Sequence, residues 1–366
     1  MIPVKIYFEN IVGQEKTKNL LAQVFENDRL AHAYLFSGNE GTGKLALSSQ
    51  FAKAILCENG DAIPCNTCKS CLLFSAGNHP NVQFVFPHPK SAKELEIQAV
   101  LKTIKSDPYQ LKLPWNNPLI SIDSIREVRR NLSLKSVGHK NRIIILIDAH
   151  KMTNEATNAV LKVLEEPPEN TYFFLLSTDL NSLLPTIISR CQLIQLAVLT
   201  DAEVEKGLGD SVALADTELR LIARMARGNM RRALQLVESG TSETKQVGIE
   251  LLRNSFKKYF EMAIYSAEIA GKFERLQLKE ILESLLLWLR DAFLLSNLGW
   301  NEVSGSLTNL DEQENLEKFT STFPDFQYQK AIKEVETGIR MLERYVQPVV
   351  ILLILMRKLR MYAIKA

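Results

Sequence analysis

A glycine-rich loop near the start of the chain constrains the fold more than any other feature. Residues 38–44 read Gly-Asn-Glu-Gly-Thr-Gly-Lys. The backbone N–H groups of such a loop can surround phosphate oxygens, and its lysine can reach the terminal phosphates. An apolar run at 33–36 precedes the loop and a helical pattern at 44–56 follows it, which is the order that a phosphate-binding loop requires. The candidate nucleotide-binding residues of this loop are Gly38, Gly41, Thr42, Gly43 and Lys44.

Two positions at which a nucleotide-hydrolysing site needs a polar side chain are apolar. Residue 45 is Leu, where a Ser or Thr hydroxyl would hold Mg²⁺. The strand-like run at 142–148 ends in Asp148 and is followed by Ala149, where a Glu would orient the attacking water. Loss of one catalytic group commonly costs about 10²- to 10⁴-fold in rate. We therefore expect no magnesium at this site, weak or absent ATP binding, and little or no intrinsic ATPase activity. A loop that has lost its ligand altogether is the alternative.

The remaining pattern divides the chain into an α/β part and an all-helical part. Up to about residue 199, strand-like runs alternate with helical patterns, which predicts a parallel sheet with helices on both faces. From residue 200 onward the strand signals vanish. We predict an α/β domain at 1–199 with an insertion at 88–118, a small helical domain at 200–242 and a C-terminal helical domain at 243–366. The predicted strands are 33–36, 82–86, 142–148 and 172–177, and the predicted helices of the first domain include 14–28, 92–105 and 154–166.

Four of the five cysteines are close together in the sequence. Cys57, Cys65, Cys68 and Cys71 fall within residues 57–71, and two C-x-x-C steps share Cys68. In a reducing compartment such a group is more typical of a metal site than of disulfides. Four thiolates satisfy the tetrahedral preference of Zn²⁺ and leave no position for water, so we predict a structural zinc module. Four free thiols are the alternative.

The composition indicates an ordinary globular protein. The chain has 366 residues, of which 46% are hydrophobic and 23% charged, and its formal net charge is +2. A net charge this small argues against binding nucleic acid mainly through a large basic surface. No targeting signal is visible, and the strongest apolar run, 349–356, is far shorter than the roughly 20 residues of a membrane helix. We expect a cytoplasmic protein that does not enter a membrane.

Three further motifs accompany the loop, the acidic strand end and the cysteine cluster. They are Leu-Lys-Val-Leu-Glu-Glu-Pro-Pro at 161–168, Ser-Arg-Cys at 189–191 and Gly-Asn-Met-Arg-Arg-Ala-Leu at 228–234. With these motifs the chain resembles the bacterial clamp-loader subunits of DNA polymerase III, which belong to the AAA+ class. The resemblance is strong over residues 8–240 and weak over the last 120. It implies an AAA+ P-loop domain with an inserted zinc module, a helical lid, and a C-terminal helical collar through which subunits assemble.

The resemblance also implies roles for individual residues. Arg190 of the Ser-Arg-Cys motif resembles the arginine that one subunit extends toward the ATP held by its neighbour. A guanidinium suits that role because it is planar and permanently charged. Arg231 resembles the arginine that reports nucleotide state from the lid, and Thr178 occupies the strand-end position of a polar sensor. An ordinary surface ion pair is the alternative for Arg190.

Within this family, Leu45 and Ala149 favour the delta-prime type over the gamma/tau type, which hydrolyses ATP. The resemblance then implies a catalytically weak end piece of a five-membered hetero-oligomer that loads the sliding clamp onto primed DNA during replication. Its partners would be the gamma/tau and delta subunits, the sliding clamp and, through the complex, primer-template DNA. One alternative is a gamma/tau-like ATPase that tolerates the two unusual residues. Another is a stand-alone zinc module that binds DNA, against which the near-neutral charge speaks.

Overall fold

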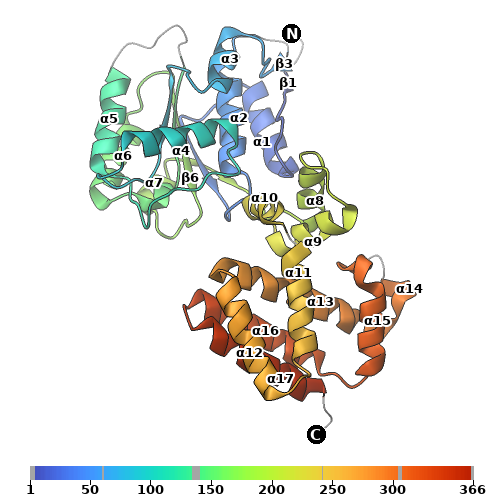
Figure 1. Cartoon of the computed structure of the whole chain (residues 1–366). Helices are drawn as coiled ribbons and strands as arrows, with labels where there is room; N and C mark the ends of the chain where they lie inside the picture. Colours follow the sequence, from blue (N-terminus) through green and yellow to red (C-terminus); the bar gives the residue numbers. More distant parts are fainter. Residues whose placement is uncertain (1–4, 60–61, 134–140, 241, 304–306, 364–366) are drawn as a thin grey trace. The chain divides into compact units, whose positions relative to one another are not determined.

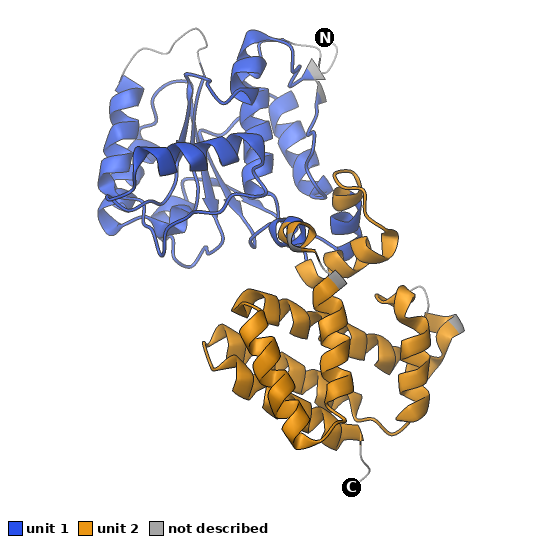
Figure 2. Cartoon of the chain, in the orientation of Figure 1, with its two compact units in different colours: residues 1–206, 228–234 blue, residues 207–227, 235–366 orange. Residues whose placement is uncertain are grey.

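The computed structural model describes residues 5–59, 62–133, 141–240, 242–303 and 307–363 (Figure 1). The chain forms two compact units (Figure 2). The first contains residues 1–206 and 228–234, and the second contains residues 207–227 and 235–366. The finer division into three domains, with borders near 200 and 243, stays a prediction. Parts of the predicted domains, including 60–61 of the cysteine module, lie outside the described residues.

The centre of the first unit is a five-stranded sheet in which all neighbouring strands are parallel. Parallel strands need crossover connections, and helices supply them here, as the alternating sequence pattern predicts. The strand order is β4-β5-β6-β2-β7, so β6 lies between the loop-bearing strand β2 and the acidic strand β5. The strands are β2 (Ala33–Ser37), β4 (Val82–Val85), β5 (Arg142–Leu146), β6 (Thr171–Ser177) and β7 (Gln192–Gln195), and a separate two-stranded sheet pairs β1 (Lys5–Ile6) with β3 (Ala62–Ile63).

Helices cover both faces of this sheet, which confirms the predicted α/β class. Alternate strand residues point to opposite faces: Phe36 and Phe174 lie in one core, and Leu35 and Leu175 lie in the other. The first core is completed by α1 (Glu15–Glu26), α2 (Lys44–Leu56) and α4 (Glu94–Ser106). The second is completed by α5 (Ile122–Ser133), α6 (Asn154–Glu165) and α7 (Pro185–Ile188). A short helix, α3 (Lys69–Ser75), contains Cys71, the last of the four clustered cysteines.

Most predicted elements of this unit are present with ends shifted by one or two residues. The predicted strand at 142–148 ends earlier, at Leu146, because Asp148 has a left-handed φ of 53° where the short helix η1 (Ala149–Lys151) begins. Strand β7 was not predicted. It is an edge strand in which Ile194 alone is buried, so its sequence lacks the apolar run by which the inner strands were found.

The second unit is helical and has its own core, which extends from Val247 to Leu359. The 24-residue helix α13 (Arg275–Leu298) packs against α11, α15 and α16. Leu282, Leu285 and Leu289 of α13 are completely buried. None of the described helices is both long and apolar enough to cross a bilayer. The helices from residue 201 onward are α8 (Asp201–Gly209), α9 (Asp216–Ala226), α10 (Met230–Ser239), α11 (Ser242–Asn254), α12 (Tyr259–Lys272), α13, α14 (Trp300–Val303), η3 (Leu310–Glu312), α15 (Gln313–Thr322), α16 (Tyr328–Glu343) and α17 (Pro348–Ala363).

Candidate functional site

The glycine-rich loop joins the end of β2 to the start of α2, as the sequence order predicts. Gly41 and Gly43 have positive φ angles of 69° and 92°, in the region that favours glycine. A side chain at Gly41 would collide with Asn229, and a Cβ at Gly43 would lie 2.7 Å from the Tyr109 hydroxyl oxygen. Both glycines are therefore required by backbone conformation and by close neighbours.

Lys44 is turned toward the loop that carries it. Its buried ammonium donates hydrogen bonds to the carbonyl oxygens of Gly38 (2.8 Å) and Asn39 (2.6 Å). The Thr42 hydroxyl also donates to the Asn39 carbonyl, at 2.8 Å. Burial lowers the pKa of Lys44 to about 8, although the negative charge of Asp148 opposes the shift. Lys44 and Asp148 are thus close enough to interact electrostatically.

The two apolar positions are built into the cores of the sheet. Leu45 is 7% exposed and belongs to the core that contains α2, and Ala149 is fully buried in the core on the opposite face. The Asp148 carboxylate is paired with Lys151 at 3.0 Å. At position 45 there is no hydroxyl, and at position 149 no carboxylate, to perform metal binding or water activation.

The predicted sensor residue Thr178 follows β6 and contacts a histidine that the sequence analysis did not single out. The two ring nitrogens of His150 lie 3.3 Å from the Ser177 hydroxyl and 3.4 Å from the Thr178 hydroxyl. Burial lowers the pKa of His150, which favours the neutral ring at pH 7. The ends of β5 and β6 are therefore connected through one imidazole.

Arg231, at the start of α10, lies beside the loop. Its Nε donates to the Tyr109 carbonyl oxygen at 3.3 Å, and its guanidinium is 4.0 Å from the Glu40 carboxylate.

Gln14 also contacts the loop region, because its amide donates to the carbonyls of Thr42 (3.2 Å) and Ala197 (2.7 Å). The structure thus gathers the predicted loop residues, Asp148 and Arg231 in one region. Their roles in nucleotide binding stay predictions.

Arg190 is located after α7, on a different part of the same unit. One guanidinium nitrogen is 2.8 Å from the Glu165 carboxylate, and another donates to the Thr186 carbonyl at 3.0 Å. About a third of its side chain is exposed, and Glu165 is more exposed still. Among the contacts described for the chain, those of Arg190 are with α6 and α7 rather than with the glycine loop.

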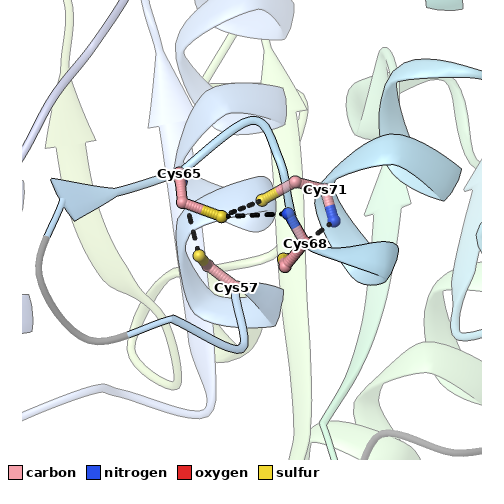
Figure 3. A group of neighbouring side chains, drawn as sticks. All are labelled: Cys57, Cys65, Cys68 and Cys71. Atoms are coloured by element: carbon pink, nitrogen blue, oxygen red, sulfur yellow. Dashed lines mark hydrogen bonds between the residues drawn. The ribbon is translucent and has the colours of Figure 1, made fainter.

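The four clustered cysteines converge on one point (Figure 3). Their sulfur atoms all lie within 4.8 Å of one another, and those of Cys65 and Cys71 are 4.0 Å apart. A tetrahedral zinc ion with Zn–S bonds of about 2.3 Å requires sulfur atoms about 3.8 Å apart. Hydrogen bonds from Thr67 and then from the Cys68 backbone lower the pKa of Cys65 to about 5, which favours the thiolate that a metal binds. Burial raises the pKa of Cys57 and of Cys71. The donor set fits a metal ion.

His79, a conceivable substitute ligand, has other partners. Its Nε2 is 3.0 Å from the Ser70 hydroxyl, and its Nδ1 accepts from the Asn81 backbone at 3.2 Å. Ser70 in turn donates to the Leu56 carbonyl at the end of α2. Ser70 therefore links α3 to the end of α2, and the His79 imidazole links Ser70 to the backbone at Asn81.

Comparison with known families settles the relationship of this α/β unit. Residues 13–200 match the family model described as "DNA polymerase III, delta subunit", which is slightly more than half of the chain. The chain belongs to this family. The match spans the glycine loop, the cysteine cluster and Arg190.

Curated relatives of this family member are DNA polymerase III subunits named delta', tau or tau/gamma. The chain is 34% identical to DNA polymerase III subunit delta' of Bacillus subtilis over 61% of this chain and 59% of that protein. It is 31% identical to subunit tau of Bacillus subtilis over 64% of this chain and 38% of that protein. It is 30% identical to subunit tau/gamma of Haemophilus influenzae over 63% of this chain and 30% of that protein. The chain therefore spans between 30% and 59% of the length of these relatives.

Two solved structures also align with this family member. A gamma subunit-related protein of DNA polymerase III from Thermotoga maritima aligns with 96% of this chain and 100% of that chain, at 17% identity and a TM-score of 0.44. The RuvB Holliday junction branch migration motor of Thermotoga maritima aligns over 64% of each chain, at 16% identity and a TM-score of 0.40.

Sequence reasoning missed several residues that contact the candidate sites in this family member. Gln14 had a local signal, because it follows Gly13 at the start of the predicted helix 14–28. Tyr109 and Asn229 had none, since each reaches the loop from a distant part of the sequence. Glu165 lies within the 161–168 motif, but its pairing with Arg190 depends on how α6 and α7 pack.

Proposed function

We propose that this chain is a delta-prime-type clamp-loader subunit that lends Arg190 to an ATP site on a neighbouring gamma/tau subunit. It contributes little hydrolysis of its own and acts as a fixed end piece of the assembly. In this role it works with the delta subunit, the sliding clamp and primer-template DNA in the cytoplasm. Residues 243–366 supply the helical collar that joins it to the other subunits.

One observation carries this proposal: the two positions needed for hydrolysis are core positions. Leu45 is 7% exposed and Ala149 is fully buried, so each side chain now contributes to packing instead of chemistry. A hydroxyl at 45 and a carboxylate at 149 would each bring a polar group into apolar surroundings, which is costly without a hydrogen-bond partner. The departures are therefore integral to the fold of this chain.

The surroundings of Arg190 support its role in a neighbouring site. Exposed ion pairs contribute only about 0–1 kcal/mol, so the contact with Glu165 can be exchanged for a contact with a more highly charged group. A triphosphate offers such a group, and arginine binds it through a planar, forked set of donors. Glu165 and Thr186 then serve to orient the guanidinium until a neighbour's nucleotide is present.

We also propose that the four clustered cysteines hold a structural zinc ion. Four cysteine ligands close the coordination sphere and leave no position for water, so zinc at this site would stabilise the fold instead of catalysing a reaction. The metal would connect the end of α2, where Cys57 lies, to the start of α3, where Cys71 lies. It thereby fixes the far end of the helix that begins at the glycine loop.

A gamma/tau-like ATPase is the second candidate, because relatives named tau and tau/gamma match nearly as well as the one named delta'. ATP turnover by the purified chain separates the two candidates. We expect turnover several orders of magnitude below that of an ordinary AAA+ ATPase, since two catalytic groups are missing. Rapid ATP turnover would indicate that the chain is a gamma/tau-like ATPase.

Replacement of Arg190 tests the trans role. An arginine supplied to a neighbouring active site is worth about 10³- to 10⁵-fold in rate. In a reconstituted clamp loader, Arg190→Ala should therefore remove the ATPase contribution of the one site that this chain contacts and leave assembly intact. Arg29→Ala, which replaces an exposed arginine after α1, is the matched control and should leave turnover unchanged. Equal turnover in wild type and Arg190→Ala complexes would contradict the proposal.

A further inference from the structure

The end of the 88–118 insertion reaches the glycine loop through Tyr109. This residue follows α4 by three positions and is partly buried. Its hydroxyl oxygen accepts a hydrogen bond from the Val12 backbone N–H at 3.1 Å, across 97 residues of sequence. The same oxygen lies against Gly43, where an added Cβ would be 2.7 Å away. The phenol therefore fills the space between the N-terminal segment and the loop.

The backbone around Tyr109 is fixed from both sides. The Asp107 carboxylate accepts from the Tyr109 N–H at 3.0 Å, and the Asp107 carbonyl accepts from the Gln110 N–H at 3.1 Å, which closes a turn. The Tyr109 carbonyl oxygen accepts from Arg231 Nε at 3.3 Å. One residue of the insertion thus contacts the segment before α1 and two of the parts predicted to surround a nucleotide, the glycine loop and Arg231.

The loop itself is engaged by other groups of this chain. The Met230 N–H donates to the Gly41 carbonyl at 3.1 Å, and the Asn229 side chain is packed against the Gly41 backbone. Lys44, which would be needed to bind a terminal phosphate, donates instead to the carbonyls of Gly38 and Asn39. The Gly41 carbonyl and the Lys44 ammonium therefore each have hydrogen-bond partners within the chain.

We propose that Tyr109 is a built-in occupant of the nucleotide pocket, so that a nucleotide can bind only after the turn at 107–110 is displaced. An aromatic ring that presents a hydrogen-bond acceptor to a backbone N–H offers the same contacts as a purine base. This occlusion is distinct from the loss of the metal-binding hydroxyl at position 45. Leu45 removes metal chemistry, whereas Tyr109 blocks entry of the nucleoside part of the ligand. The proposal does not depend on the role of Arg190.

Binding of a fluorescent ATP analogue to the full chain tests this occlusion. If the closed arrangement is favoured by about 100 to 1, its removal raises the apparent affinity about a hundredfold. Tyr109→Ala should therefore bind the analogue roughly ten to a hundred times more tightly than wild type. Tyr109→Phe keeps the ring and loses only the contact with Val12, so its gain should be smaller. Leu95→Ala, on the exposed face of α4 in the same insertion (83% exposed), should match wild type.

A double variant tests whether the gain in nucleotide affinity depends on the glycine loop. Tyr109→Ala combined with Lys44→Met should bind no more tightly than wild type, because the new affinity must come from the glycine loop. Equal affinities of wild type and folded Tyr109→Ala would overturn the proposal, and so would a gain that survives loss of Lys44.

A measurement on the wild-type chain does not depend on any variant folding correctly. Hydrogen exchange at the Val12 amide reports whether the Tyr109 hydroxyl still accepts its hydrogen bond. With millimolar ATP we expect either no binding or binding accompanied by faster exchange at Val12 and over 107–110. Bound ATP with undiminished protection of Val12 would show that nucleotide and Tyr109 fit together, and the occlusion would be wrong.

Discussion

At Lys44 of the glycine loop, the charge that suits phosphate binding conflicts with burial of the side chain. Lys44 keeps the charge that a phosphate would require, yet its side chain is buried and depends on two backbone carbonyls for compensation. Leu45, the next residue, has no group that could bind a metal and lies in the core. Burial of this charge costs stability, because the ammonium group leaves water.

The lowered pKa of Lys44 predicts the pH dependence of that cost. The pKa is about 8 in the folded chain and 10.5 in its ordinary state. Between these values the unfolded chain holds the proton and the folded chain does not, so this residue makes stability rise with pH in that window. Below about pH 8 both states are protonated and the full cost of burying the charge applies.

We therefore expect Lys44→Met to gain most in stability, relative to wild type, near pH 7. The gain should shrink as the pH rises toward 10. Urea unfolding of both chains at several pH values measures it. Lys102→Met, at an exposed position of α4, should show no such trend. A difference between Lys44→Met and wild type that is constant from pH 7 to pH 10 would contradict the inferred burial of charge.

At the scale of elements, the cysteine cluster determines how α2 and α3 are joined. Cys57 caps the end of α2, Cys68 caps the start of α3, and their sulfur atoms lie in the same cluster. With no metal, three partly buried thiols and the buried thiol of Cys71 would be left to hold this connection. We expect about one zinc ion per chain by elemental analysis.

Removal of that metal should loosen the module. Cys65→Ser or a strong chelator should abolish zinc binding and lower the melting temperature, because metal-binding energy in such modules is folding energy. Cys191→Ser replaces the one cysteine outside the cluster and should keep the metal. A wild-type chain that purifies folded and free of metal would refute the zinc module.

The contact between α11 and α13 gives a second prediction at this scale. Within a helix, Gly→Ala normally stabilises by about 1 kcal/mol. At Gly248 of α11, however, the new Cβ would lie 3.0 Å from the Ile281 carbonyl oxygen of α13. We expect Gly248→Ala to destabilise the chain by roughly 1–3 kcal/mol, because the backbone of a packed helix cannot move away cheaply.

Gly271 of α12 provides the matched comparison. A Cβ at Gly271 would meet nothing within 4 Å, so Gly271→Ala should be neutral or should stabilise by up to about 1 kcal/mol. Denaturant unfolding of both variants measures the difference. If the two substitutions change the free energy of unfolding equally, the close approach of α11 and α13 does not make Gly248→Ala destabilising.

At the scale of the whole molecule, the two compact units have separate cores. The core of the second unit is formed by residues between Val247 and Leu359. A fragment of residues 243–366 should therefore fold without the α/β part, with helical circular dichroism and a cooperative thermal transition. A fragment that aggregates or melts without cooperativity would show that the helical region needs the preceding residues. If the fragment folds, its binding to a gamma/tau partner tests the predicted collar.

The sequence by itself determined the class of the first unit, because the signals for it are local. A glycine loop between a strand and a helix can be recognised within residues 33–56 alone. Four cysteines within 57–71 indicate a metal module without reference to the rest of the chain. The apolar residues at 45 and 149 are equally visible. Each of these features depends on neighbours a few positions away, which is why the alternation of strands and helices was enough to predict a parallel sheet.

Only the tertiary structure decided which distant residues meet at these features. Tyr109 reaches Val12 across 97 residues, and Arg190 meets Glu165 across 25. Strand β7 is recognised as a strand because it pairs with β2, which is remote in sequence. Such contacts leave no periodic pattern in the sequence, since they arise from the packing of whole elements. For that reason the altered glycine-loop motif could be recognised in the sequence, whereas the contacts of Tyr109 with Val12 and Gly43 were found only in the folded chain.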